Sequence, residues 1–533
     1  MVFCDECNLP ADDLYGTQAV ITFLRQMVEQ GGYWNSDNKW VMLRRIQFVG
    51  AANPPTDAGR VVLSNRFLRW APVLLVDYPV EESMKQIYRV FNQGLLKLHK
   101  HLMDLLDPLN NAMVIFYLRN QERFTPDIAP QYIYSPRELS RWTRAMFEAM
   151  EPMSKDNEAM SPEELVTLWG HEALRLFHDR CITHEERDWV QKLVDSVAET
   201  FFAPKGVDTV KCLQRPLLYS KWITGKYIQT GRADLKVFVS ERLKRFYDEE
   251  LDVKLVIFDD VLDHVLRIDN VLSHPMGHLL LVGESGVGKT VLTKFVAWMN
   301  NLKIYQIKAN SRYTVEQFDD DLRVLFKRVG IDSEKICFIF DESNALSSAF
   351  LERMNSLLAS GEIPGLFEGD ERVQLMAGIR DSFSKKKGEV ILDTDDELQR
   401  QFTKLIQRNL HVCFTMNPAG GDFAGRSNTS PALFNRCVVD WFGTWSFDAL
   451  TQVAHEFTRN IDTGFNQYSG PPDSSKAEVL QKVAEVMQIQ DIGLQEAVVA
   501  ALVSMHESAK KMTIRVGKLT GRQHYLSPRY VIV

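Results

Sequence analysis

Residues Gly283 to Thr290 have the order Gly-Glu-Ser-Gly-Val-Gly-Lys-Thr, which fits the pattern G-x-x-x-x-G-K-[ST]. The apolar run 279–282 in front of them predicts a buried strand, and residues 291–298 behind them predict a helix. Glycines in such a turn let backbone N–H groups point at an anion, and the N-terminus of the following helix adds the positive end of its dipole. The stretch therefore predicts a phosphate-binding loop within a strand–loop–helix unit of an α/β fold.

This loop predicts which atoms would hold a nucleotide. Lys289 should reach the β- and γ-phosphates, and the hydroxyl of Thr290 should ligate Mg²⁺. The cofactors expected are therefore ATP and Mg²⁺. The alternative is a chance match in an ordinary loop, and the flanking strand and helix argue against it. All eight loop residues are expected at the phosphates: Gly283, Glu284, Ser285, Gly286, Val287, Gly288, Lys289 and Thr290.

Two apolar segments end in an Asp-Glu pair. One is 337–340, followed by Asp341 and Glu342, and it lies 341 − 289 = 52 positions after Lys289, a workable spacing for a strand–helix–strand crossover. In phosphate-loop enzymes the Asp lies beside Mg²⁺ and the Glu polarises the attacking water. We therefore expect Asp341 to hold the metal together with Thr290, and Glu342 to be catalytic. The other pair is Asp5-Glu6, which alone is a weak signal because many strands end in acids.

The Asp-Glu pair is the first of five features that occur twice in the same order. The offset between the copies is 341 − 5 = 336 positions at the Asp and 417 − 53 = 364 at a later Asn, so the second copy carries 364 − 336 = 28 more residues, placed around 361–400. A long internal repeat is a stronger signal than any single motif. The features are Asp5-Glu6 and Asp341-Glu342, strands ending at Asn53-Pro54 and Asn417-Pro418, Asn65-Arg66 and Asn435-Arg436, a helical region, and Ser135-Pro136-Arg137 and Ser527-Pro528-Arg529.

The repeat predicts tandem modules, in each of which a parallel-sheet α/β domain precedes an all-helical one. The first module begins at its Asp-Glu strand and lacks a phosphate loop. Within it, the apolar run 73–76 that ends at Asp77 is expected to be a strand. The predicted divisions are 1–105 for the rear part of the first large domain, 106–235 for its helical domain and a connection, 236–445 for the complete second large domain, and 446–533 for its helical domain.

The composition of the chain argues against several classes of function. The net charge of −8 implies neither a nucleic-acid partner nor an anionic membrane surface. No apolar run approaches the ~20 residues of a membrane span. The seven cysteines are scattered, which suits reduced thiols in the cytosol. Cys4 and Cys7 form a C-x-x-C, but no second pair completes a zinc site.

These ordered motifs resemble those of the AAA+ ATPases, and more closely those of the dynein heavy chains. In that ring of six linked modules the chain resembles the back part of the third and most of the fourth. The Glu of the first Asp-Glu pair favours the cytoplasmic type, and Cys7 departs from the usual Ile. The resemblance extends over nearly the whole chain and is carried by Asp5 to Pro10, Gly50 to Asp57, Phe295 to Asn300, Asp341 to Asn344, Phe350 to Asn355 and Pro364 to Gly369.

The resemblance implies roles for further residues. Asn417 matches sensor I, which helps to position the attacking water, and Arg529 matches sensor II, which reaches the γ-phosphate. Arg436 matches the arginine finger, which would act in the site of the preceding module. Its first-copy equivalent is Arg66, with Arg69 as the rival candidate. A surface ion pair is the alternative for each lone arginine. Residues 255–258 lie where the adenine pocket usually forms.

The function implied is that of an ATP-binding segment of a minus-end-directed microtubule motor, in which the fourth module binds or slowly hydrolyses ATP in a regulatory role. Implied partners are the neighbouring modules and, through parts outside this sequence, dynein intermediate and light chains and microtubules. The implied location is the cytoplasm, on the cytoskeleton, with no nucleic acid or membrane as partner. The sequence is expected to be a fragment. Two alternatives stay open: another tandem AAA+ remodelling ATPase, and a regulatory or scaffolding segment that binds ATP without turnover.

Overall fold

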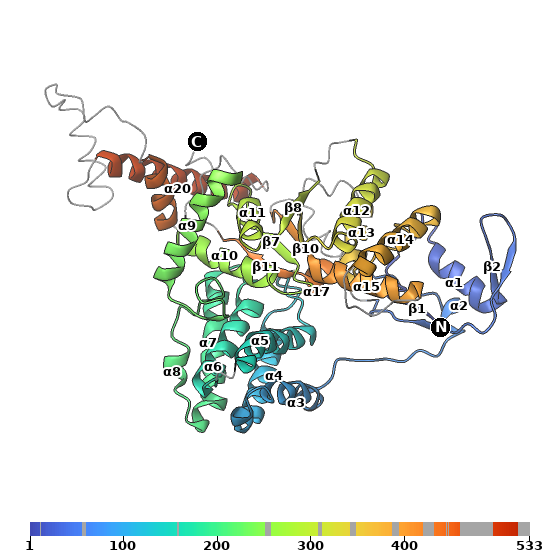
Figure 1. The fold of residues 1–533 in the computed structure, drawn as a ribbon, viewed down its shortest axis with the longest axis horizontal. Helices are drawn as coiled ribbons and strands as arrows, with labels where there is room; N and C mark the ends of the chain where they lie inside the picture. The colour runs from blue at the N-terminus through green and yellow to red at the C-terminus, as the bar shows by residue number, and fades with distance from the viewer. Residues whose placement is uncertain are drawn as a thin grey trace. The chain divides into compact units, whose positions relative to one another are not determined.

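A computed structural model of the chain describes residues 1–10, 12–55, 60–129, 131–156, 159–250, 257–307, 312–341, 348–385, 394–418, 431–443, 445, 447–458 and 494–520. Its contacts divide the chain into two units, residues 1–79 and 80–533. Figure 1 labels the elements of both units.

The first unit contains short elements around a small core. Two strands pair in parallel, with Cys4 opposite Gly50, and two others form an antiparallel hairpin. The buried side chains of its core belong to Cys7, Ile21 and Leu24. The elements are β1 (Val2–Cys4), α1 (Ala19–Gln30), β2 (Gly32–Trp34), β3 (Trp40–Met42), β4 (Phe48–Gly50) and α2 (Asn65–Leu68).

The parallel pair of the first unit recurs in the second unit with the same register. There β9 (Ile336–Asp341) pairs with β10 (Leu410–Met416), and Phe340 lies opposite Phe414. The offsets from Cys4 and Gly50 are 340 − 4 = 336 and 414 − 50 = 364, the same two values as in the sequence repeat. The internal repeat is therefore also a repeat of strand pairing.

The strand expected at residues 73–77 does not form, and that prediction was wrong. Val73, Leu74, Leu75 and Val76 are 72, 83, 91 and 88 % exposed. In the second module the strand that follows the Asn-Arg pair is β11 (Val438–Trp441), which pairs with β7 (Leu279–Val282) in front of the phosphate loop. Among the described residues of the first unit there is no counterpart of β7, so this segment has no strand to pair with.

Residues 81–212 form a helical bundle with an aromatic core (Figure 1). Trp142, Trp169, Phe116 and Phe177 are fully buried and contact one another edge-on or stacked. The first helix, Glu81–Leu96, precedes the division predicted at 105, yet it packs against the two α-helices that follow that division. The division itself stays a prediction. The helices are α3 (Glu81–Leu96), α4 (Leu106–Arg123), α5 (Arg137–Lys155), α6 (Pro162–Ala173), α7 (His184–Phe201) and α8 (Thr209–Cys212), with a 3-10 helix at Lys100–Leu105 and a π-helical turn at Leu174–His178.

Two short strands and a long helix follow the bundle. The strands are β5 (Tyr219–Ser220) and β6 (Ile228–Gln229), which pair antiparallel, and the helix is α9 (Arg232–Glu250). Helix α9 packs against the helix that follows the phosphate loop.

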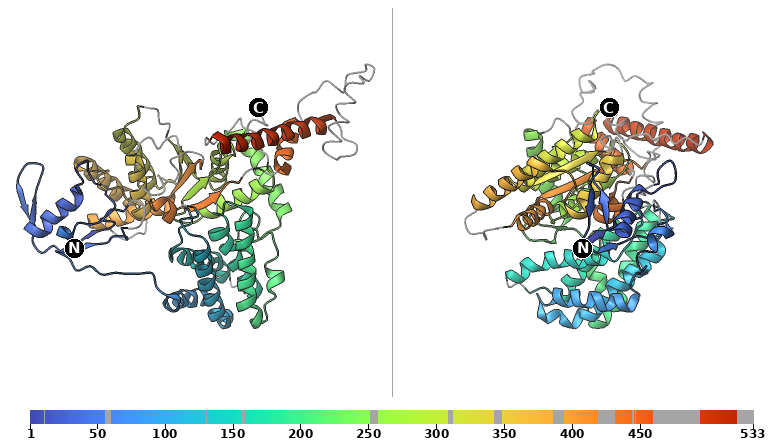
Figure 2. Two further views of the ribbon diagram at one scale, coloured as in Figure 1. Left: turned by 180° about the vertical axis from the view of Figure 1, so that it is seen from behind. Right: turned by 90° about the vertical axis from the view of Figure 1, so that its right-hand side faces the viewer.

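The second module is built on a five-stranded, fully parallel sheet in the order β11-β7-β10-β9-β8, where β8 is Lys303–Gln306. Side chains alternate between two apolar cores, so that Leu280 and Phe338 enter one while Leu281 and Ile339 enter the other. Burial on both faces explains why these strands are continuous apolar runs. Figure 2 shows the strands enclosed between helices.

Helices cover both faces of this sheet. On one face lie α10 (Asp259–Leu272) and α11 (Lys289–Met299); on the other lie α12 (Val315–Gly330), α13 (Ser348–Ser360), α14 (Gly369–Lys385) and α15 (Asp395–Asn409). Further helices are α17 (Pro431–Arg436), α18 (Phe447–Thr458) and α20 (Leu494–Thr520), of which the last two pack together. None of the helices in the described part of the chain combines the length and apolar character needed to cross a membrane.

Candidate functional site

The phosphate loop lies between β7 and α11, at the carboxyl end of a strand that is buried along its whole length. Gly288 has φ +96°, a conformation that side-chain-bearing residues rarely adopt. A Cβ on Gly283 would lie 2.6 Å from Cβ of Phe442. The two glycines are therefore required, one by backbone conformation and the other by close packing. Helix α11 begins at Lys289, so the N–H groups of its first turn lie at the loop.

Lys289 folds back over the loop. Its Nζ donates to the carbonyl oxygens of Gly283 at 2.6 Å and of Glu284 at 2.7 Å. Burial raises the pKa of Glu284, and Lys289 acts against that rise. The ammonium group thus lies over the turn in which phosphates are bound by loops of this pattern.

Thr290 and Asp341 meet beside the loop, as the sequence predicts. The Thr290 hydroxyl lies 3.3 Å from Oδ1 of Asp341, which also accepts a hydrogen bond from the Thr415 hydroxyl at 2.6 Å. The other carboxylate oxygen, Oδ2, accepts from Nε2 of Gln306 at 2.5 Å. A hydroxyl and a carboxylate side by side are the hard oxygen donors that Mg²⁺ prefers, so this donor set fits that ion.

Asn417 stands close to the loop. It follows β10 directly, and the carbonyl of its neighbour Met416 accepts a hydrogen bond of 3.0 Å from the N–H of Gly283. The other predicted residues of this site, Glu342 and Arg529, lie outside the described residues, as do residues 255 and 256 of the expected adenine pocket. The structure thus brings Lys289, Thr290, Asp341 and Asn417 to one edge of the sheet.

Arg436 ends α17 and lines a different feature, a cavity of about 380 Å³ between the helical bundle and the sheet. Among the residues described, this lining includes none of 283–290. Arg137, the first-copy equivalent of Arg529, lines it too. Sequence reasoning did not single out Arg137, although the repeated Ser-Pro-Arg triplet held the signal. Within the described part of the chain, six arginines and four carboxylates line the cavity: Arg137, Arg141, Arg144, Arg175, Arg267 and Arg436, with Glu148, Glu172, Asp179 and Asp440.

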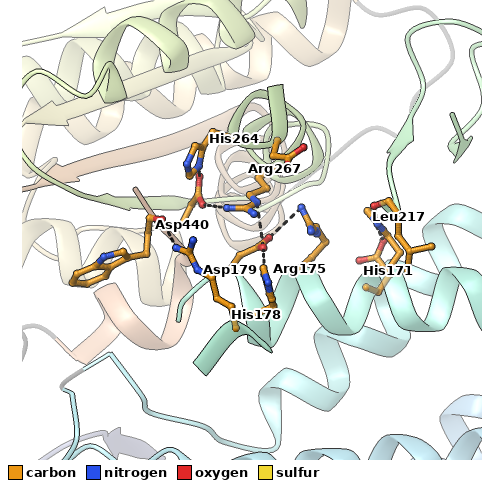
Figure 3. A network of polar contacts seen from close by, with 12 residues as sticks. His171, Arg175, His178, Asp179, Leu217, His264, Arg267 and Asp440 are labelled. Carbon is orange, nitrogen blue, oxygen red and sulfur yellow. Dashed lines mark hydrogen bonds and ion pairs between the residues drawn. The ribbon is translucent and has the colours of Figure 1, made fainter. Parts of the chain in front are cut away.

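Four of the charged residues that line the cavity, Arg175, Asp179, Arg267 and Asp440, belong to a buried network of charges, which Figure 3 shows. Arg267, on α10, donates from Nη1 to Asp440 at 3.0 Å and places Nε 3.2 Å from Asp179. Asp179 also pairs with Arg175 at 3.3 Å, and Asp440 with His264 at 2.7 Å. These residues come from the helical bundle, α10 and β11, so the network joins the bundle to the sheet domain.

Electrostatics keeps the two carboxylates of this network ionised. Burial alone would raise the pKa of Asp179, but Arg175 and Arg267 outweigh it and hold that pKa well below the usual value. Burial likewise opposes ionisation of Asp440, and His264 and Arg267 lower its pKa. The same carboxylates raise the pKa of Arg267 in spite of its burial.

A backbone hydrogen bond also joins the helical bundle to the sheet: the N–H of Trp441 donates to the carbonyl oxygen of Asp179 at 3.1 Å.

In the first unit, the structure places the two candidate finger residues near helix α2. Arg66 lies within the helix, and the guanidinium of Arg69 lies 5.0 Å from the ring centroid of Trp70.

Comparison with known proteins gives consistent matches along the chain. Residues 253–532 match the family described as "P-loop containing dynein motor region D4", residues 91–187 match "Dynein heavy chain, ATPase lid domain", and residues 1–79 match "P-loop containing dynein motor region".

Individual relatives agree. Proteins named "Dynein heavy chain, cytoplasmic" are 55 % identical in Dictyostelium discoideum, and 50 % identical in both Caenorhabditis elegans and Drosophila melanogaster, in each case over 100 % of this chain. The chain spans 11 % of the length of each of these three relatives. The first of the family matches alone covers more than half of the 533 residues, and the chain belongs to the family of P-loop containing dynein motor regions.

Proposed function

We propose that the second module binds ATP with Mg²⁺ at residues 283–290, and that it is the regulatory fourth-module site of a cytoplasmic dynein heavy chain. The observation that carries this proposal is the meeting of Thr290 with Asp341, 3.3 Å apart, beside a lysine that folds over a glycine-rich turn. In this arrangement one strand–loop–helix unit and β9, which lies on the far side of β10 in the same sheet, supply phosphate and metal donors together.

The residues of the loop would act as follows. Lys289 exchanges the carbonyls of Gly283 and Glu284 for phosphate oxygens, so binding replaces two existing hydrogen bonds rather than filling an empty donor. Thr290 and Asp341 would hold Mg²⁺, which when bound offsets negative charge on the β- and γ-phosphates. Backbone N–H groups at the start of α11 would hold the phosphates from the other side.

Turnover would need further groups. We assign Asn417 to orienting the attacking water, Glu342 to accepting its proton and Arg529 to the γ-phosphate. For Glu342 and Arg529 this assignment rests on the sequence pattern alone. Slow or absent hydrolysis is compatible with a regulatory role, and the measurement below separates the two.

Arg436 would act in the site of the preceding module rather than in its own. Two observations support this. It lines a cavity that excludes residues 283–290, and it shares that cavity with Arg137, the first-copy equivalent of a residue assigned to the γ-phosphate. An arginine supplied by a neighbour can raise phosphoryl-transfer rates by about 10³–10⁵. The first-copy counterpart would be Arg66, with Arg69 the rival.

The activity of the whole protein follows from its relatives. Because those relatives are named cytoplasmic dynein heavy chains, we propose that the parent protein is a minus-end-directed microtubule motor in the cytoplasm. Its partners would be the neighbouring modules, dynein intermediate and light chains, and microtubules.

The test is binding of a fluorescent ATP analogue to the 533-residue chain, whose sequence contains a single phosphate-loop pattern. Lys289→Ala should weaken binding at least tenfold, because it removes the phosphate-binding ammonium group. Lys244→Ala, at an exposed position of α9, is the control and should leave binding unchanged. Equal binding by wild type and Lys289→Ala would overturn the site assignment. Phosphate release that stops in Glu342→Gln would identify hydrolysis, and release that is absent from both would identify binding without turnover.

A further inference from the structure

Asp341 is held by more donors than the phosphate-loop motif contains. Of the three side-chain hydrogen bonds that it accepts from described residues, one comes from Thr290 of that motif. The others come from Gln306 at the end of β8 and from Thr415 in β10, at 2.5 and 2.6 Å, and both are shorter than the 3.3 Å contact to Thr290. No short sequence motif points to Gln306 or Thr415.

The strand register explains how these donors arrive. Thr415 lies directly opposite Asp341 on the neighbouring strand β10. Gln306 lies opposite Ile339 on the other neighbour, β8, and its longer side chain spans the two-residue diagonal to Asp341. Thr415 is 5 % exposed and Gln306 is half-buried. The carboxylate is therefore hydrogen-bonded from both sides by residues of the two neighbouring strands in the same sheet.

These hydrogen bonds determine which carboxylate oxygen of Asp341 faces the phosphate loop. Gln306 occupies Oδ2, while Thr290 and Thr415 converge on Oδ1. A carboxylate that is free to rotate would lose conformational entropy when it binds a metal, and it would present either oxygen. Hydrogen bonds from surrounding residues remove that freedom, and their loss typically costs 10–100-fold in metal affinity.

The internal repeat supplies an independent contrast. The first-copy equivalent of Thr415 is residue 415 − 364 = 51, which is Ala51 and has no hydroxyl. In the described part of the first unit, the carboxylate of Asp5 instead accepts from the N–H of Glu6 at 3.0 Å. The hydroxyl donor is thus a feature of the second module.

We infer that Gln306 and Thr415 are positioning residues that orient Asp341 for Mg²⁺ and so set the metal affinity of the second-module site. This inference rests on the proposed function, because it assumes that a Mg²⁺–nucleotide complex binds there. Neither residue is proposed to contact the metal ion or the nucleotide. Their effect should therefore appear in the Mg²⁺ requirement and not in phosphate binding by the loop.

The experiment is a Mg²⁺ titration of the 533-residue chain with a fluorescent ATP analogue, alongside analogue binding in EDTA. Gln306→Met removes the amide donor at similar length, Thr415→Val removes the hydroxyl at similar volume, and Thr415→Ala reproduces the first copy. Each should raise the Mg²⁺ concentration at half-saturation by about 10-fold or more. The dissociation constant in EDTA should stay within about twofold, since the loop is untouched. Gln374→Met, at an exposed position of α14, should change neither value.

The outcomes separate the two levels of the argument. Failure of the wild-type chain to bind the analogue overturns the proposed function and this inference with it. Normal binding with an unchanged Mg²⁺ midpoint in Gln306→Met overturns this inference alone, as does equal weakening with and without Mg²⁺. Because Thr415 is buried, the Mg²⁺ titration of Thr415→Val is interpreted only if the melting temperature of this variant matches that of the wild type. If it does not, Gln306→Met, at a half-buried position, provides the test.

Discussion

Replacing Arg267 by Met tests whether the charge network of Figure 3 holds the helical bundle to the sheet domain. The Arg267 side chain is 11 % exposed and bridges two carboxylates, Asp179 and Asp440, that are 3 and 2 % exposed. Methionine keeps much of the apolar stem and removes the charge. Both carboxylates then stay buried with fewer counter-charges.

The expected magnitude follows from what remains. Removing one partner of a buried ion pair costs about 3–5 kcal/mol. Asp179 keeps Arg175 and Asp440 keeps His264, so the loss should fall in the lower part of that range, about 3–4 kcal/mol. At about 2–4 °C per kcal/mol for a domain of 150–250 residues, the melting temperature should drop by roughly 6–16 °C.

The assay is thermal unfolding followed by circular dichroism, with Arg372→Met at an exposed position of α14 as the matched control. The control should change stability by no more than about 0.5 kcal/mol. Adding Asp440→Asn to Arg267→Met removes one stranded charge and should restore at least about 1 kcal/mol through their coupling. A loss of less than about 1 kcal/mol in the free energy of unfolding of Arg267→Met, or no coupling in the double variant, would refute the conclusion that the network stabilises the contact between the bundle and the sheet domain.

Two further predictions concern the cavity wall and the loop. Burial raises the pKa of Glu172 from 4.5 to about 6. Above pH 6 the carboxylate is charged in both states, and this charge costs free energy in the folded state. The cost fades as the pH falls through 6 and 4.5, because the group becomes neutral in both states. Glu172→Gln should therefore stabilise the chain by about 2 kcal/mol at pH 8 and by only about 0.4 kcal/mol at pH 4.5; equal gains in melting temperature at both pH values would contradict this. Gly283→Ala would bring a Cβ to 2.6 Å from Phe442, so it should destabilise by about 1–3 kcal/mol and weaken analogue binding at least tenfold. Gly94→Ala in α3, where a Cβ meets nothing within 4 Å, is its control and should stabilise by about 0.5–1 kcal/mol.

The parts of the site that lie in contiguous motifs could be predicted from the sequence. Residues 283–290 and the Asp341 strand each combine a side-chain pattern with its own flanking strand, so local order determines the local structure. The two repeat offsets agree with the strand register of the structure, because two copies of one fold keep the same pairing.

The remainder depends on contacts between distant segments. Asp440 and Arg267 are 173 positions apart, and nothing in either local sequence indicates the other. Gln306 and Thr415 are polar residues near the ends of apolar strands, a pattern shared by many residues with no role. The run 73–76 has the composition of a strand, yet composition cannot supply the neighbour that a parallel strand requires.

The identical register of the two parallel strand pairs bears on how such modules diverge. Between β1 and β4 lie 48 − 4 − 1 = 43 residues, and between β9 and β10 lie 410 − 341 − 1 = 68. Closing the longer connection costs only about 0.4 kcal/mol more, since loop entropy grows with the logarithm of length. Duplicated modules can thus gain or lose whole helices in this crossover while the strand ends that carry the acidic and amide side chains stay aligned. For protein engineering, the same tolerance recommends this crossover as the place to insert a reporter domain.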